Sequence, residues 1–319
     1  MRQSDPRLLA IYFRWLRIGY LEKFGLVNKS YKKDLAWSLL LYRSFLATCT
    51  QEVPFYLIVP KGDLELFVET FSRSLESIQE SRRPRFLSEE EVLEAAGETV
   101  PSTFTGWHTQ QVVKLAFSQL GILENYATLD SATIFTRELD IGRFFDGDTL
   151  RYAGFEIDRG AWFKSIRENK EYGWLRGELK NFDEVYCHID NFYNKNEGAA
   201  PAFNYTFGIG LFSSMLCSEL LKAVSLKGLH SFSDMVAEAP YEFTWYGVFA
   251  RHYCGKDTPA QGPLFKPIIN INDFCDVSVE YTLEEQYIGF LFQPPASDAP
   301  DLQNIALLVS ACENNSRIS

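Results

Sequence analysis

The sequence predicts an α/β protein with a mostly parallel sheet flanked by helices. Residues 24–27 and 53–59 are apolar runs of strand length, and the second is apolar at every position. A run that is apolar on both faces is typical of a strand buried in a parallel sheet. Residues 33–47 and 64–75 follow these two runs and have helical patterns. The order strand, helix, strand, helix indicates a parallel sheet covered by helices.

The following segments continue this pattern and bring a carboxylate to a strand end. Residues 86–87 predict a short strand, and Ser88 stands where a helix N-cap is expected, before three glutamates. Residues 106–120 predict a further helix, and residues 126–129 predict a strand that ends immediately before Asp130. The second half is less regular and rich in aromatic residues, with helices expected at 213–224 and 243–251.

Composition places the chain among compact intracellular proteins. It has 319 residues, 46% of them hydrophobic, which is enough for a sizeable core. The net charge of -11 argues against a protein that follows a nucleic-acid backbone. None of the six cysteines forms a C-x-x-C pair, so we expect reduced thiols. We find no apolar run of about eighteen residues and no signal-peptide pattern, and expect a cytoplasmic protein.

The two ends of the chain differ from its middle. Residues 7–23 predict a helix with three arginines on one stripe. It is either an amphipathic arm at the inner face of a membrane or an arm packed on the body or a second subunit. After residue 292 the chain becomes a polar tail. We therefore divide it into an N-terminal arm (1–23), a single domain (24–292) and a tail (293–319).

Asp130, Ser131 and Ala132 form the first candidate site. A carboxylate at the carboxyl end of a parallel strand stands in the crevice where α/β sheets bind ligands. Such carboxylates can hold a divalent metal that neutralises a leaving diphosphate. Asp130 is well placed for this, whereas Ala132 ligates nothing. A turn or cap role for Asp130 is the alternative.

The helix expected at 106–120, with Thr105 as its N-cap, has a mixed polar face. Trp107, Gln111 and Lys114 share that face, which suits a sugar hydroxyl and a phosphate. A solvated face of a surface helix is the alternative. His108 lies near the apolar side and is interpreted as a hydrogen-bonded structural residue.

Three further segments carry candidate residues. The polar loop expected at 28–31 follows the first strand, where Tyr31 could stack on a base and backbone amides could meet phosphate. Glu242 and Tyr246 are four residues apart on an expected helix, and a carboxylate among aromatics suits a general base. A buried, hydrogen-bonded glutamate is the alternative. Gly208 and Gly210 permit close backbone approach to a ligand, or form an ordinary loop.

Together these segments resemble a group of bacterial glycosyltransferase-like proteins, mostly of unassigned specificity, related to GT-A enzymes that build surface polysaccharides. The resemblance covers about residues 24–250. Its motifs are the Lys-Ser-Tyr loop with Asp34, the Val-Pro and Asp-Leu pair within 57–64, the Gly-Trp-His-x-Gln-Gln-x-x-Lys-Leu helix at 106–115, the Leu-Asp-Ser-x-Thr segment at 129–133 and the Glu-x-x-x-Tyr-Gly segment at 242–247.

The resemblance implies a GT-A-like (Rossmann-like) domain that transfers a sugar from a nucleotide-sugar donor to a saccharide acceptor. It places Glu242 near the acceptor, and we assign Tyr246, Gly208 and Gly210 to the same side. Glu242 and Asp130 are the expected catalytic residues. The expected donor site consists of Lys29, Ser30, Tyr31, Trp107, Gln110, Gln111, Lys114, Asp130 and Ser131.

One position departs from the family pattern, which has Asp where this chain has Ala132. Asp130 and a distant ligand could hold Mn²⁺ or Mg²⁺ alone, or the enzyme could work without metal if Lys114 neutralises the diphosphate. The chain could also have lost catalysis and act as a binding protein for a saccharide or a partner enzyme. A nucleotidyltransferase is a third alternative, disfavoured because no glycine-rich phosphate loop occurs near the N-terminus.

Overall fold

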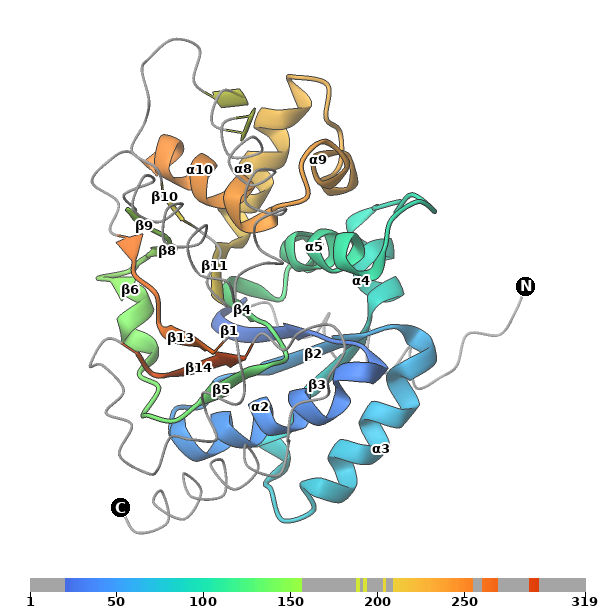
Figure 1. Cartoon of the computed structure of the whole chain (residues 1–319), viewed down its shortest axis with the longest axis vertical. Helices are drawn as coiled ribbons and strands as arrows, with labels where there is room; N and C mark the ends of the chain where they lie inside the picture. Colours follow the sequence, from blue (N-terminus) through green and yellow to red (C-terminus); the bar gives the residue numbers. More distant parts are fainter. Residues whose placement is uncertain are drawn as a thin grey trace, which may run out of the picture.

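The computed structural model describes residues 21–156, 188–189, 192–193, 203–204, 209–254, 260–268 and 287–292. Its centre is a five-stranded sheet with the order β11-β4-β1-β2-β3 (Figure 1). The first four strands in the sequence run parallel, and β11 is antiparallel to β4. The predicted α/β class is therefore confirmed. The strands are β1 (Glu22–Lys29), β2 (Phe55–Val59), β3 (Arg85–Ser88), β4 (Leu123–Leu129) and β11 (Ile209–Ser213).

Helices cover both faces of this sheet (Figure 1). On one face lie α2 (Leu35–Thr48) and α3 (Leu64–Ser74). On the other lie α4 (Glu89–Ala96), α5 (Gly106–Ala116), α8 (Ser214–Ser225), α9 (Phe232–Glu238) and α10 (Glu242–Cys254). Short 3-10 helices occur at Lys32–Asp34, Lys61–Asp63, Glu80–Arg82, Phe117–Leu120 and Ile141–Phe144.

The two cores divide the strand residues by alternation. In β2, Tyr56 and Ile58 pack with the helices of the α5 face, whereas Phe55, Leu57 and Val59 pack with α2 and α3. Successive side chains of a strand point to opposite faces. Because both faces are buried, every position in this strand is apolar, which is why its sequence predicted it well.

Smaller sheets join the later parts of the chain. In the largest, β14 (Gly289–Phe292) pairs antiparallel with β5 (Thr133–Phe135) and parallel with β13 (Phe265–Ile268). Two-residue strands pair as β6 (Phe145–Asp146) with β7 (Thr149–Leu150), β8 (Tyr152–Ala153) with β12 (Ala260–Gln261), and β9 (Phe155–Glu156) with β10 (Phe203–Asn204).

Several local predictions are confirmed. The Ser88 hydroxyl accepts a hydrogen bond from the backbone N–H of Glu91, and the Glu91 carboxylate accepts one from the backbone N–H of Ser88. This reciprocal pair fixes the start of α4. The helix ends at Gly97, whose φ of 68° lies in the left-handed region that glycine tolerates.

Other predictions are corrected. Asn28 and Lys29 belong to β1 rather than to a loop, because Asn28 pairs with both neighbouring strands and Lys29 pairs with Ile58. The helix expected to reach residue 120 is α-helical only to Ala116 and ends in a 3-10 turn. Glu22 and Lys23 begin β1, whereas the predicted arm extended to residue 23.

The rest of the arm and the tail at 293–319 lie outside the described residues. None of the helices in the described ranges has the length and apolar character needed to cross a membrane.

Candidate functional site

The candidate site lies at the carboxyl ends of β1 and β4. The two strands are paired, with Asn28 opposite Leu129, so Ser30 and Ser131 emerge side by side. The Ser30 hydroxyl accepts hydrogen bonds from Ser131 (3.0 Å) and from Ser38 on α2 (2.7 Å). The Asn28 amide donates to the carbonyl of Leu129 at 2.8 Å. These bonds fix the two strand ends relative to each other and to the first turns of α2.

Lys114 of α5 joins two carboxylates at this edge. Its ammonium nitrogen lies 3.0 Å from Asp130 Oδ1 and 3.0 Å from Glu242 Oε1. Asp130 follows β4, and Glu242 is the first residue of α10. The Lys114 and Glu242 side chains are 3% and 8% exposed, whereas Asp130 is 41% exposed. The cluster therefore reaches from the buried interface of α5 and α10 to solvent.

Two carboxylates keep this lysine charged. Burial of the ammonium by itself would lower the pKa of Lys114, but the charges of Asp130 and Glu242 outweigh it and raise the pKa. The Phe243 ring lies 4.6 Å from the ammonium, a cation–π distance. With one ammonium and two carboxylates the cluster has a net charge of about −1.

Gln111 holds the start of α10 against α5. Its side-chain oxygen accepts a hydrogen bond from the backbone N–H of Glu242 at 3.2 Å, and its side-chain nitrogen donates to the carbonyl of Trp107. Gln111 and Lys114 are buried, so this part of the helix is not the solvated face that was the alternative. Trp107 is 44% exposed, and Gln110 is partly exposed.

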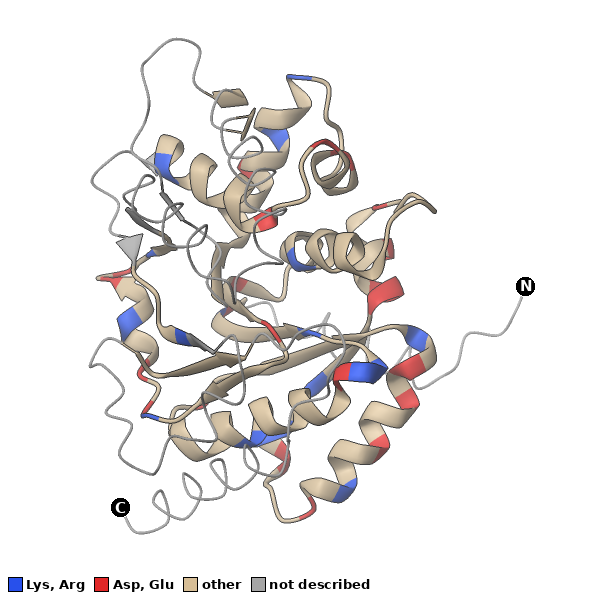
Figure 2. Cartoon of the chain, viewed as in Figure 1, with Lys and Arg blue, Asp and Glu red and all other residues tan. Residues whose placement is uncertain are grey.

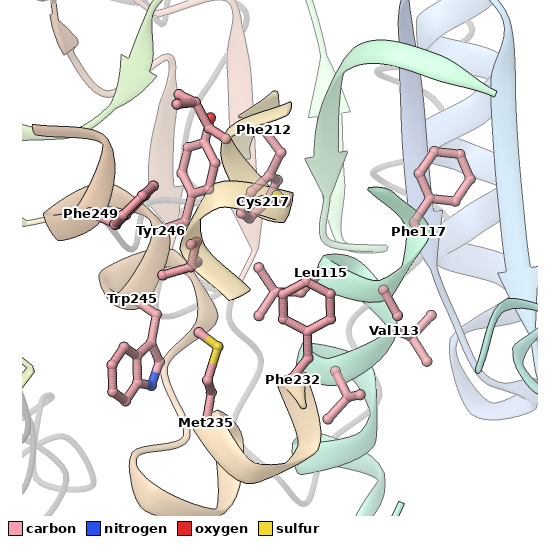
Figure 3. Close-up of a cluster of buried hydrophobic side chains, with 14 of the residues drawn as sticks. Val113, Leu115, Phe117, Phe212, Cys217, Phe232, Met235, Trp245, Tyr246 and Phe249 are labelled. Carbon is pink, nitrogen blue, oxygen red and sulfur yellow. The ribbon is translucent and has the colours of Figure 1, made fainter. Parts of the chain in front are cut away.

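Packing behind the site holds α5 and α10 together. Figure 3 shows Leu115 beside Phe232 of α9, and Val113 and Phe117 belong to the same apolar cluster as side chains from α8, α9 and α10. His108 lies at the other end of α5, where its Nδ1 lies 2.8 Å from the Thr105 hydroxyl. It has the structural hydrogen bond that the sequence predicted.

A second buried lysine lies at the end of β1. The Lys29 ammonium forms an ion pair with Glu89 at 2.9 Å, donates to the carbonyl of Ser30 at 2.9 Å, and lies 3.5 Å from the centre of the Tyr31 ring. The Tyr31 hydroxyl donates to the carbonyl of Gly106, the first residue of α5. Lys29 and Tyr31 thus connect the strand end to the start of α4 and α5.

Sequence reasoning missed Glu89 and Phe243 as members of these clusters. Figure 2 shows red acidic positions at the start of α4, where Glu89, Glu90 and Glu91 lie. The sequence interpreted these glutamates only as favourable charges at a helix start. The sequence signal for Glu89 is its position directly after β3, because the parallel strands β1 and β3 end at the same edge of the sheet. Lys29 ends β1 at that edge, and a buried lysine needs a carboxylate partner.

Two residues assigned with Glu242 to the acceptor side, Tyr246 and Gly210, lie in the packing around the Lys114 cluster. Tyr246 is 4% exposed, and its hydroxyl accepts a hydrogen bond from the backbone N–H of Ser213 at 2.8 Å. Figure 3 shows it within the apolar cluster. Gly210 lies in β11, where an added Cβ would come within 2.3 Å of the Phe243 ring. Gly210 therefore allows Phe243 to pack over Lys114. Gly208 lies outside the described residues.

The residues present do not form an ordinary divalent metal site. No group of three or more His, Cys, Asp and Glu side chains in the described ranges could hold a metal ion. Asp130 Oδ1 and Glu242 Oε1 are already bound by the Lys114 ammonium. The charge of Lys114, considered for neutralising a diphosphate, is balanced by these two carboxylates within the fold.

Comparisons with known proteins complete this description. The model of a family of unknown function (DUF6492) matches residues 23–167, less than half of the chain. No curated protein matches the sequence.

The solved structures to which this chain is similar include three sugar transferases. One is the bifunctional glycosyltransferase WbbM, with 14% identity, a TM-score of 0.41 and coverage of 71% of this chain and 39% of WbbM. This chain thus spans about two fifths of WbbM. Another is galactosyltransferase LgtC in complex with donor and acceptor sugar analogues, with 11% identity, a TM-score of 0.47 and coverage of 90% and 95%. The third is mouse xyloside xylosyltransferase 1, with 14% identity, a TM-score of 0.36 and coverage of 69% and 83%.

Proposed function

We propose that this chain transfers a sugar from a nucleoside diphosphate sugar to a saccharide acceptor, in the synthesis of a cell-surface polysaccharide. The observation that carries the proposal is the Lys114 ammonium, which brings Asp130 and Glu242 together at the carboxyl edge of a parallel sheet. Ligands of open α/β sheets bind at this edge. A buried lysine with two acidic partners at this edge is a candidate functional site.

The donor is expected to lie over the ends of β1 and β4. Ser30 and Ser131 are adjacent there, and the exposed Lys32 and Lys33 follow immediately before α2. Hydroxyls, these two exposed cations and the N-terminus of α2 suit a diphosphate. Trp107 is half exposed on the neighbouring helix and offers an aromatic face to a sugar or base.

Glu242 is the proposed general base. One of its oxygens, Oε1, accepts a hydrogen bond from Lys114, and Oε2 accepts none from any residue in the described part of the chain. Oε2 can then take the proton of an acceptor hydroxyl. As it does so, the hydroxyl oxygen of the acceptor bonds to the anomeric carbon of the donor sugar, and the bond from that carbon to the nucleoside diphosphate breaks. Lys114 and Gln111 hold the carboxylate in position during this step.

Nucleotide binding tests the donor site. A thermal-shift screen of nucleoside diphosphates, with and without Mn²⁺, should show stabilisation by one nucleotide. Asp130→Asn should change the size of this stabilisation, because Asp130 is the half-exposed carboxylate that holds the Lys114 ammonium at the end of β4. If no nucleotide stabilises the chain, sugar transfer from such a donor is wrong.

Turnover tests the base. Glu242→Gln should lower the transfer rate by about 100-fold or more while retaining donor binding, since a positioned general base contributes about 10²–10⁴. Glu219→Gln is the matched control, because Glu219 lies on α8 in a surface pair with Lys222. Equal rates for Glu242→Gln and the control would remove Glu242 from the mechanism.

The second candidate is a non-catalytic binding protein for a saccharide or a partner enzyme. Ala132 favours it, because the carboxylate that the family pattern has at this position is missing. Saccharide binding without nucleotide binding would support this candidate.

We also propose that the chain works in the cytoplasm and that residues 7–23 contact a membrane surface or a second copy of the chain.

A further inference from the structure

The Lys114 ammonium stands where a divalent cation would be expected in a site of this kind. It lies between the strand-end carboxylate of Asp130 and the carboxylate of Glu242, which belongs to a helix far along the sequence. Both carboxylates use an oxygen to bind the ammonium at 3.0 Å. Position 132, where a further carboxylate would stand in the family pattern, is alanine.

A metal ion and this ammonium cannot use the same two oxygens. Mg²⁺ lies about 2.0–2.1 Å from its oxygen ligands, and Ca²⁺ about 2.3–2.6 Å. A cation at such a distance from Asp130 Oδ1 and Glu242 Oε1 would meet the Lys114 nitrogen. The Lys114 side chain is 3% exposed and the Phe243 ring lies 4.6 Å from its nitrogen, so the ammonium is enclosed beside the two carboxylates.

Charge leads to the same conclusion. With Lys114 in place, the three groups have a net charge of about −1, and a divalent cation would also face the like charge of the ammonium. Without Lys114, the two carboxylates would have a charge of about −2, which matches a divalent cation.

We propose that Lys114 is a built-in replacement for a divalent cation, and that its removal converts the cluster of Asp130 and Glu242 into a metal site. The proposal concerns the site to which we assign sugar transfer. It stands independently of that activity, because it is a statement about which cation the two carboxylates bind.

Direct Mn²⁺ titration of the full chain, without any nucleotide, tests this proposal. By calorimetry the native chain and Lys114→Arg should show no saturable binding, because both keep a cation between the carboxylates. Lys114→Met removes the charge but keeps much of the side-chain volume. It should bind Mn²⁺ about 100-fold or more tightly than the native chain, since removing one unit charge a few ångströms away changes the energy by several RT. Adding Asp130→Asn to Lys114→Met should remove this binding.

Two results would overturn the proposal. One is saturable Mn²⁺ binding by the native chain, and the other is a folded Lys114→Met chain that binds no Mn²⁺. If Lys114→Met does not fold alone, it is refolded with and without Mn²⁺. Recovery only with the metal supports the proposal, and equal failure in both conditions contradicts it. Because no nucleotide is present, failure here is distinct from failure of the proposed sugar transfer.

Discussion

Two buried lysines lie near the carboxyl edge of the central sheet but differ in the charges around them. Lys29 ends β1 and has one carboxylate partner, Glu89. Lys114 lies on α5 and has two, Asp130 and Glu242. Burial lowers the pKa of Lys29 in spite of the charge of Glu89. For Lys114 burial acts in the same direction, but the two carboxylates together raise the pKa.

At Lys114 two carboxylates at 3.0 Å outweigh burial, whereas at Lys29 burial outweighs Glu89 together with the smaller contributions of Glu90 and Asp63. A single ion pair does not repay the loss of hydration of both ions, whereas a second partner adds attraction without burying another lysine. Lys29 gains further contacts from the Ser30 carbonyl and the Tyr31 ring, which are local in the sequence. We infer that Lys29 positions the end of β1, while Lys114 sets the charge of the site.

The largest expected effect is on the free energy of unfolding. Lys114→Met should lower it by about 3–5 kcal/mol, the cost of leaving a buried carboxylate without its partner. That carboxylate is Glu242, whose side chain is 8% exposed. Lys29→Met should cost about 1–2 kcal/mol, because Glu89 is 16% exposed and can be hydrated more easily. Urea unfolding without metal at neutral pH measures both.

The matched control for this comparison is Lys222→Met, which removes an exposed lysine from a surface pair with Glu219 on α8. It should change stability by less than about 1 kcal/mol. A larger loss for Lys29→Met than for Lys114→Met would contradict the assignment of the stronger cluster to Lys114.

An intermediate effect is expected from a change behind Phe243, the ring that lies beside the Lys114 ammonium. Gly210→Ala should destabilise the chain by about 1–3 kcal/mol, the usual cost of overpacking. Its Cβ would lie 2.3 Å from Phe243, and Phe243 lies over Lys114. Sugar transfer should slow as well, because Phe243 directly follows Glu242, the proposed base. Differential scanning calorimetry and a transfer assay measure the two effects.

Gly62→Ala is the control for this substitution, since a Cβ there would meet nothing within 4 Å. Unchanged stability in Gly210→Ala would mean that Phe243 can move aside. The ring would then have no fixed position over Lys114.

The backbone was predictable where one physical rule dominated. The strand β2 is buried on both faces, so its composition alone identifies it. The start of α4 was predictable because Ser88 and Glu91 satisfy each other's backbone groups. The end of β1 was not, because Asn28 and Lys29 are polar and resemble a loop in sequence. Their burial comes from strand pairing and from partners far along the chain.

The site residues were named from sequence, but their grouping was not. Asp130, Lys114 and Glu242 each attracted notice at a strand end or on a helix. Helical periodicity shows which residues share a face of α5, but not which strand end that face packs over. Tyr246 illustrates the same limit. It is four residues from Glu242, yet its hydroxyl binds the backbone of Ser213 in the core. The two-residue strands carry too short a pattern for any periodicity to show.

The smallest expected effect is a difference in titration between the two lysines. In a chain with isotope-labelled lysine, NMR should show the Lys29 ammonium losing its proton below the ordinary value of 10.5 and the Lys114 ammonium above it. The signals are assigned by their absence in Lys29→Met and Lys114→Met.

The sign of the accompanying stability change follows from these directions. Because the Lys29 pKa is lowered on folding, the native chain gains stability relative to Lys29→Met as pH rises from that lowered pKa towards 10.5. The contribution of Lys114 is fully present below 10.5 and is lost only as pH rises through its raised pKa. Between the lowered pKa of Lys29 and 10.5, the stability deficit of Lys29→Met should therefore grow while that of Lys114→Met stays constant. Parallel changes in the two variants would mean that the second carboxylate does not distinguish these lysines.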